Sequence, residues 1–418
     1  MTLTVTQKER EYLRELAKRQ AEIAALPIMK ERTDEWYTHN ALKGKRPMII
    51  IEIGSFWQDL KPESQCESPF ARELEDTILR HIVQHELVDD DCVCPDFIEI
   101  DKQVNSHDFG MHLNIHYSED TNGRKLGYKI DHPITCIEED FHKLKPFEFY
   151  YHHDETMAKY EAIGDILGDI LPVRIANNAN NWYFKLTAKA VALMGLENWM
   201  FSLMDEPEEH HRLMRYITDN TMAYLKWQED NGLLTMNNGN HYAGAGSRGF
   251  SHDLAPDANG KVRLKDLWIN MNSQESYSIS PAHYKEFVFP YYKECADKFG
   301  YIYYGCCEPV HKIWKDCLET IPNLRKVSIS PWCDEDFMGE ALRGSNTIYS
   351  RKPAPRYLGV GHDFDEEGYT EHIKKTLHAA RGCNLELIYR DVYTLTGDPS
   401  KPRRAVKIMR DLIETEWQ

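Results

Sequence analysis

The chain has 418 residues, of which 42% are hydrophobic and 28% charged, a balance typical of a soluble globular protein and too apolar for a disordered one. Its 67 acidic residues against 50 basic ones give a formal net charge of −17, which repels nucleic-acid phosphates and anionic lipid surfaces. We therefore expect neither a nucleic acid nor a membrane as a partner.

The start of the chain is charged throughout, and no apolar run approaches the roughly 20 residues that a membrane-spanning helix needs. Ten cysteines are scattered along the sequence, as is usual for reduced thiols and unlike a disulfide framework. Both features favour a cytoplasmic protein.

Local sequence patterns predict the first elements of the chain. Thr6 and Glu9 have the spacing of a capping box, which predicts a helix that Pro27 ends. We expect residues 1–45 to form an N-terminal helical extension and residues 46–418 to form the main domain. The apolar run 47–54 is typical of a strand buried on both faces.

A β-hairpin insertion follows. Residues 111–117 and 126–130 alternate between apolar and polar, and the turn pair Asn122-Gly123 lies between them. Alternation on both sides of such a pair predicts two antiparallel strands.

From about residue 170 the chain alternates strand-like runs with helical sequence. The strand candidates are 171–175, 233–236, 301–304, 326–330, 347–350 and 385–389. Strand followed by helix, repeated, implies parallel pairing. A count near eight over this length predicts an α/β fold, a closed (β/α)8 TIM barrel with the helical extension and the hairpin added to it.

Residues 244–249 match the dinucleotide pattern G-x-G-x-x-G, but loop sequence, and not a helix, follows them. We expect a mobile loop that can fold over the mouth of the barrel.

In such a barrel the chemistry belongs at the carboxyl ends of the strands. We predict three catalytic residues there: Glu275, Tyr304 and Arg390. The predicted substrate-binding residues are Phe56, Trp57, Asn238, His241, Asn272, Trp332, Arg351 and Lys352. The predicted metal ligands are Cys306, Cys307 and Asp391.

Each assignment has an ordinary alternative. The two adjacent thiols could pack between strand and helix, Glu275 could be an exposed loop carboxylate, and the cations could pair with local acids. The aromatic residues could belong to the core.

Four segments resemble landmarks of the uroporphyrinogen decarboxylase superfamily, in order and at similar spacing, over roughly residues 170–415. They are VALMGLENWMFSLMDEPEEHHRLMRYITDNTMAYLKWQEDNG (191–232), SISPAHYKEFVFPYYKE (278–294), YYGCCEPVHKIW (303–314) and TGDPSKPRRAVKIM (396–409). The resemblance implies a (β/α)8 barrel and one of two activities, porphyrinogen decarboxylation or cobalamin-dependent methyl transfer.

Two departures from the superfamily select between these activities. The decarboxylases carry an Arg-Gln-Ala-Gly-Arg segment after the first strand, whereas this chain has IEIGSFWQDL (51–60), without an arginine. The methyltransferases bind zinc with a His-x-Cys pair and a later Cys. Here the pair is Tyr304-Gly305-Cys306, and the later position is taken by Arg390-Asp391.

The first hypothesis is therefore a methyltransferase of the corrinoid-dependent branch. It would move a methyl group from a small methylated substrate, for example an aryl methyl ether, to the cobalamin of a separate corrinoid protein. Zinc, held by a changed ligand set, is an optional second cofactor, and a homodimer is kept open as the assembly. The alternatives are a decarboxylase-like lyase acting on a carboxylated substrate and a binding protein without catalytic activity.

Overall fold

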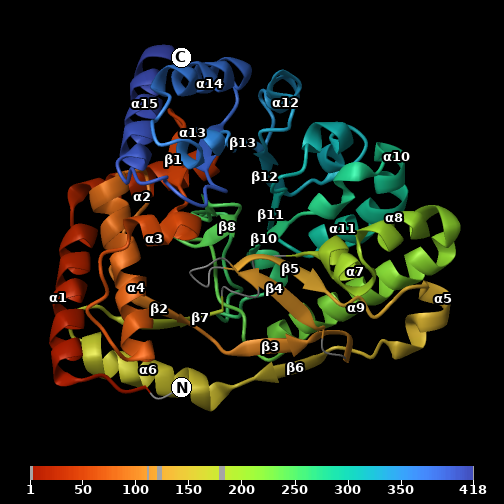
Figure 1. The fold of residues 1–418 in the computed structure, drawn as a ribbon, viewed down its shortest axis with the longest axis horizontal. Helices are drawn as coiled ribbons and strands as arrows, with labels where there is room; N and C mark the ends of the chain where they lie inside the picture. The colour runs from red at the N-terminus through yellow and green to blue at the C-terminus, as the bar shows by residue number, and fades with distance from the viewer. Residues whose placement is uncertain (1–2, 111–112, 120–124, 178–183, 418) are drawn as a thin grey trace.

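The computed structural model describes residues 3–110, 113–119, 125–177 and 184–417. Its centre is a parallel six-stranded sheet with the strand order β1-β14-β13-β12-β11-β10 (Figure 1). The strands are β1 (Met48–Ile51), β10 (Trp268–Met271), β11 (Tyr301–Tyr304), β12 (Leu324–Ile329), β13 (Ile348–Arg351) and β14 (Leu385–Tyr389). The prediction of an α/β fold with parallel strands is confirmed.

A second parallel pair, β2 (Ile98–Asp101) with β7 (Val173–Ala176), lies outside this sheet. Phe184 adds one parallel bridge to Met271 at the β10 edge. Among the described residues no backbone pairing joins β1 to β2, and 233–236 do not form a strand. The closed ring of strands that the sequence predicted is therefore not confirmed, because the sheet ends at β1 on one side and at β10 on the other.

Helices pack around the strands (Figure 1). In the first half of the chain they are α1 (Gln7–Ala24), α2 (Pro27–Asn40), α3 (Trp57–Leu60), α4 (Pro69–Val83), α5 (Ile137–Asp140), α6 (His153–Leu167), α7 (Leu186–Met194), α8 (Leu196–Asp205) and α9 (Pro207–Asp230). In the second half they are α10 (Pro281–His283), α11 (Phe289–Ala296), α12 (Glu335–Leu342), α13 (Arg356–Gly359), α14 (Glu366–Ala379) and α15 (Lys401–Glu416). No helix in the described ranges combines the length and the apolar character that crossing a membrane requires.

The N-terminal extension is helical, as predicted. The Thr6 side chain accepts a hydrogen bond from the Glu9 backbone, and the Glu9 side chain accepts one from the Thr6 backbone, so the capping box is present. α1 packs against α4 and α6. From α2, Trp36 reaches the inner face of the sheet, where it clusters with Ile50 and Ile388.

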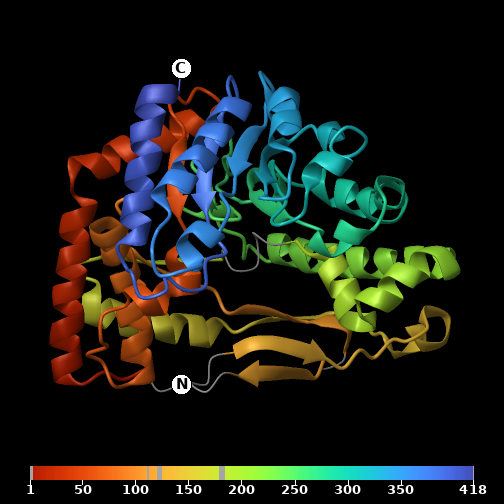
Figure 2. The same ribbon diagram turned by 45° about the horizontal axis from the view of Figure 1, so that its top comes forward.

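Two antiparallel pairs form the insertion. β3 (Val104–His107) pairs with β6 (Glu148–Tyr151), and β4 (Ile115–Glu119) pairs with β5 (Lys125–Ile130). The predicted hairpin is thus present, while its predicted turn at Asn122-Gly123 lies outside the described residues. Figure 2 shows the β4–β5 hairpin along the lower edge of the molecule, apart from the C-terminal helices.

The glycine-rich segment differs from its prediction. β8 (Tyr242–Gly244) and β9 (Ser247–Arg248) form a tight hairpin in which Ala243, Ala245 and Ser247 have no solvent exposure. The hairpin lies on the inner face of the sheet, where Ser247 donates a hydrogen bond to Glu386. The expected mobile loop is therefore wrong: small residues let this segment fill the space between strands, with Gly246 at φ +90° and its Cα close to Ile388.

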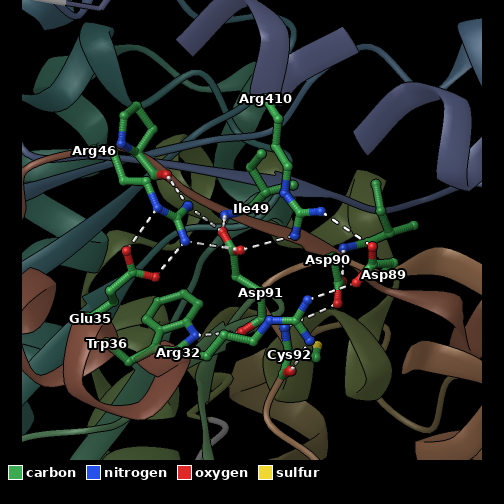
Figure 3. A network of polar contacts seen from close by, with 12 residues as sticks. Arg32, Glu35, Trp36, Arg46, Ile49, Asp89, Asp90, Asp91, Cys92 and Arg410 are labelled. Atoms are coloured by element: carbon green, nitrogen blue, oxygen red, sulfur yellow. Dashed lines mark hydrogen bonds and ion pairs between the residues drawn. The ribbon is translucent and has the colours of Figure 1, made fainter. Parts of the chain in front are cut away.

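An ion-pair network joins β1 to the C-terminal helix (Figure 3). The buried Asp91 carboxylate accepts from the Ile49 backbone at 2.8 Å and pairs with Arg46 at 2.8 Å and with Arg410 at 3.3 Å. These arginines hold the pKa of Asp91 below its usual value, against the effect of burial. The network fixes the edge strand β1 between α2 and α15.

Candidate functional site

A group of charged and thiol side chains lies where three strands of the sheet end, at their carboxyl ends. We call them the rim cluster: Glu52 after β1, Cys306 and Cys307 after β11, and Arg390 and Asp391 after β14. Cys307 Sγ lies 3.6 Å from Cys306 Sγ and 3.7 Å from Asp391 Oδ2. Arg390 Nε lies 3.3 Å from Glu52 Oε2 and 3.4 Å from Asp391 Oδ1.

The two thiols of the rim cluster differ in acidity. A hydrogen bond from Cys307 lowers the pKa of Cys306, and the positive charge of Arg390 lowers it further, while burial opposes both. The same hydrogen bond, together with burial, raises the pKa of Cys307. Cys306 is therefore the thiol that ionises first, with Cys307 as its donor.

Glu308 holds the turn that carries these thiols. Its carboxylate accepts hydrogen bonds from the Cys306 backbone at 2.9 Å and from the Ser273 backbone at 3.1 Å. Burial raises its pKa. The turn begins at Gly305, whose φ of +98° is a conformation that favours glycine.

No zinc site is found among the described residues, although the predicted zinc ligands are neighbours. Cys307 lies beside both Cys306 and Asp391, but no group of three or more His, Cys, Asp or Glu side chains among the described residues is arranged to hold a metal ion. Zinc in proteins takes four donors in a tetrahedron, three or more of them from the chain. Zinc therefore stays a prediction from the sequence, and no step of the chemistry below uses it.

Neighbours in a strand point to opposite faces, and this separates Arg351 from Lys352. Arg351 faces the covering helices, where it pairs with Glu335 at 2.7 Å. Lys352 faces inward, where its Nζ donates to Tyr303 at 2.7 Å and to Ser350 Oγ at 2.8 Å. Burial lowers the pKa of Lys352 to about 7, so its amine is partly neutral in the interior.

The other predicted catalytic residues form their hydrogen bonds outside the rim cluster. Tyr304 is fully buried, and its hydroxyl bonds to Ser273 Oγ at 2.8 Å and to Tyr284 at 2.6 Å. Glu275 is partly buried and accepts from Thr187 Oγ1 at 2.7 Å.

The remaining predicted substrate residues are dispersed. Phe56 and Trp57 lie in the main hydrophobic core, and Asn272 is buried after β10. The Asn238 amide donates to the Ser251 and Leu254 carbonyls and fixes a loop. Trp332, 71% exposed, borders a shallow hollow with Tyr277, Cys307 and Glu308.

A cavity of about 320 Å³ adjoins the rim cluster. Its wall includes Glu52 and Gly54 after β1, and also Ile98 and Glu99 of β2, so it occupies the gap between these two strands, which do not pair with each other. Tyr242 also lines the cavity, and its hydroxyl oxygen lies 3.4 Å from Nη1 of Arg390. Of the predicted residues, His241 lines this cavity, 3.4 Å from Glu99.

Several residues that line the cavity were not predicted as site residues from the sequence: Glu52, Arg80, His81, Tyr242 and Arg248. Only Glu52 had a usable signal, because it is the one charged residue in the predicted strand 47–54. Arg80 and His81 lie on a helix, and Arg248 lay within the segment that we expected to be a mobile loop.

Comparisons with known proteins support the fold. The solved structure of a "methyltransferase from Methanosarcina mazei" superposes with a TM-score of 0.50 at 11% identity, covering 92% of this chain and 99% of that one. No protein-family model matches the sequence. No curated protein matches it either. At this identity the likeness shows a shared fold over almost the whole length of both chains.

Proposed function

We propose that this protein is a methyltransferase of the uroporphyrinogen decarboxylase superfamily that passes a methyl group from a small methylated substrate to the cobalt of a separate corrinoid protein. The name of the structural neighbour and its nearly complete overlap support the reaction class. The observation that carries the proposal is the position of Arg390, held beside Glu52 and Asp391 at the carboxyl edge of the sheet, next to a cavity of ligand size.

The gap between β1 and β2 agrees with a (β/α)8 barrel in which the cavity separates these two strands. In this proposal the substrate enters the cavity, and its reacting end points to the rim cluster. The methyl acceptor approaches from the partner protein.

The transfer breaks the bond between the methyl carbon and its oxygen and forms a bond between that carbon and cobalt. Reduced cobalt supplies the electron pair for the new bond. The departing oxygen keeps its own pair and takes up a proton. The protein therefore has to align the donor and stabilise the negative charge that develops on the leaving oxygen.

Arg390 is the residue best placed to stabilise the leaving oxygen. Its guanidinium lies beside the Glu52 and Asp391 carboxylates and also contacts the Tyr242 hydroxyl on the cavity wall. Tyr242 can relay the proton. An aryl methyl ether is the donor that we favour, because a phenolate is a better leaving group than an alkoxide.

The first test is a single-turnover assay. The purified chain is mixed with reduced cobalamin and a panel of methyl ethers, and formation of methylcobalamin is followed by its absorbance. We expect transfer from at least one aryl ether, reduced about 100-fold or more in Arg390→Gln through loss of a charged hydrogen bond to the leaving oxygen. The exposed Arg381→Gln serves as the matched control and should keep the wild-type rate. Absence of transfer from every donor would remove the proposal.

A lyase that acts on a carboxylated substrate is the second candidate. It is favoured by two arginines, Arg80 and Arg248, that line the cavity. With a methoxybenzoate as the substrate, this activity would release carbon dioxide without any change in cobalamin absorbance, which separates the two reactions.

A further inference from the structure

Two guanidinium groups face the cavity, and neither forms an ion pair with a carboxylate among the described residues. Arg248 donates to Cys92 Sγ at 3.5 Å, and its Nε is buried without a hydrogen bond. Arg80 lies 4.7 Å above the Trp57 ring. In the part of the chain that the structure describes, neither arginine lies within 4.0 Å of a carboxylate oxygen.

His81 lies close to both arginines. Burial and the charges of Arg248 and Arg80 together lower the pKa of His81 to about 4. His81 is therefore neutral at pH 7, and its ring can donate or accept one hydrogen bond at the cavity wall.

The carboxylates of the same wall already have cations beside them. Glu52 lies 3.3 Å from Arg390, and Glu99 lies 3.4 Å from His241. Asp90, behind the wall, accepts from the Ile51 backbone at 2.7 Å and from Gln84 at 2.6 Å. Glu52 and Asp90 lie close enough to Arg248 to raise its pKa, but no carboxylate of the described residues forms an ion pair with Arg80 or Arg248, so both guanidinium groups can still pair with a ligand.

A partly buried charge without a partner is costly to a fold. Two such charges on one cavity wall are explained if a bound anionic ligand pairs with both of them. The rest of the wall supplies a flat apolar surface from Ile53, Val93, Pro95 and Phe97. Glu52 and Glu99 on the same wall would repel a dianion such as phosphate.

We propose that the cavity binds a small organic monocarboxylate, with its carboxylate between Arg80 and Arg248 and its apolar body against the Ile53 and Phe97 side. This assignment deepens the proposed function and rests on it in one respect, that the bound acid is the methyl donor. A methoxylated aromatic acid would then direct its ether toward Glu52 and Arg390. Binding itself can be measured without any methyl transfer.

The test is calorimetric titration of the full chain with 4-methoxybenzoate, with anisole as the neutral analogue and with inorganic phosphate. We expect the acid to bind, and to bind better than either of the others. Arg248→Gln and Arg80→Gln should each weaken binding about 10- to 100-fold, because each removes a charged hydrogen bond. Arg248→Lys keeps the charge and should lose less, and Arg381→Gln should change nothing.

Thermal melting of each variant checks that it folds; if Arg248→Gln does not, Arg248→Lys and Arg80→Gln carry the test. Equal affinity for anisole and 4-methoxybenzoate, a preference for phosphate, or unchanged affinity in the folded variants would overturn the assignment. Carboxylate binding without methyl transfer would contradict the proposed function and leave the assignment of the binding site intact. Methyl transfer from neutral ethers without carboxylate binding would contradict the assignment of the binding site and leave the proposed function intact.

Discussion

At the scale of single residues, the rim cluster assigns different roles to side chains that are adjacent in sequence. Cys306 and Cys307 share a hydrogen bond, and only Cys306 has its pKa lowered. Arg351 pairs with a helix, whereas Lys352 faces the interior. The sequence could place these pairs at strand ends, but it could not decide which member of each pair faces inward.

Alkylation should reveal the acidity of Cys306. We expect Cys306 to react with iodoacetamide at neutral pH faster than Cys66, whose pKa burial raises to about 12. Rates are measured by mass spectrometry of labelled peptides between pH 6 and 10. Arg390→Gln should move the pH dependence of Cys306 upward, because a nearby positive charge is lost. Identical pH profiles for both cysteines would contradict the assignment.

At the scale of elements, the β8–β9 hairpin is the part of the fold that sequence patterns described least well. Its glycines match a dinucleotide pattern, yet they serve close packing against β11 and β14, where a Cβ on Gly244 would meet the Tyr303 ring and one on Gly246 would meet Ile388. A local pattern of glycines gives no information about which distant strands will surround it. By contrast, the capping box of α1 and the β4–β5 hairpin depend on neighbouring residues only, and both were predictable.

Gly246→Ala tests this packing. The new methyl group would lie 2.5 Å from Ile388 at a φ of +90°, so we expect the free energy of unfolding to fall by about 2 to 4 kcal/mol. Gly260→Ala is the control: it has φ +80° and open space around it, and strain alone should cost about 1 kcal/mol. Urea unfolding of both variants gives the comparison, and equal losses would refute the packing role.

Glu9 couples two helix starts, and its effect depends on pH. Besides closing the α1 capping box, it accepts from the Glu67 and Ser68 backbones at 2.8 and 2.9 Å, at the start of α4. These hydrogen bonds lower the pKa of Glu9 from 4.5 to about 2. The stabilisation is therefore complete above pH 4.5 and is lost as the pH falls through about 2.

Glu9→Gln should lower the free energy of unfolding by about 1 to 2 kcal/mol at pH 7. The difference from wild type should shrink as the pH approaches 2. Glu11→Gln, on the exposed face of α1, is the matched control. Denaturant unfolding at several pH values measures both, and a deficit independent of pH would show that the carboxylate charge is not responsible.

At the scale of the whole molecule, the parallel α/β architecture followed from the repetition of strand and helix, while the site did not. The cavity draws its wall from residues as far apart as Ile50 and Arg248. It lies where β1 and β2 do not pair with each other, and the sequence predicted β1 but not β2. Arg390 and the thiols were found because strand ends converge, which is a property of the fold class.

The central claim is that the cavity and the rim cluster form one site, with the acid end of a substrate at the arginines and its ether at Arg390. A crystal structure of the chain with 4-methoxybenzoate tests this most directly. We predict the carboxylate within hydrogen-bond distance of Arg80 and Arg248 and the ether oxygen on the side of Glu52 and Arg390. A ligand in the opposite orientation, or one bound in the hollow beside Trp332, would contradict it.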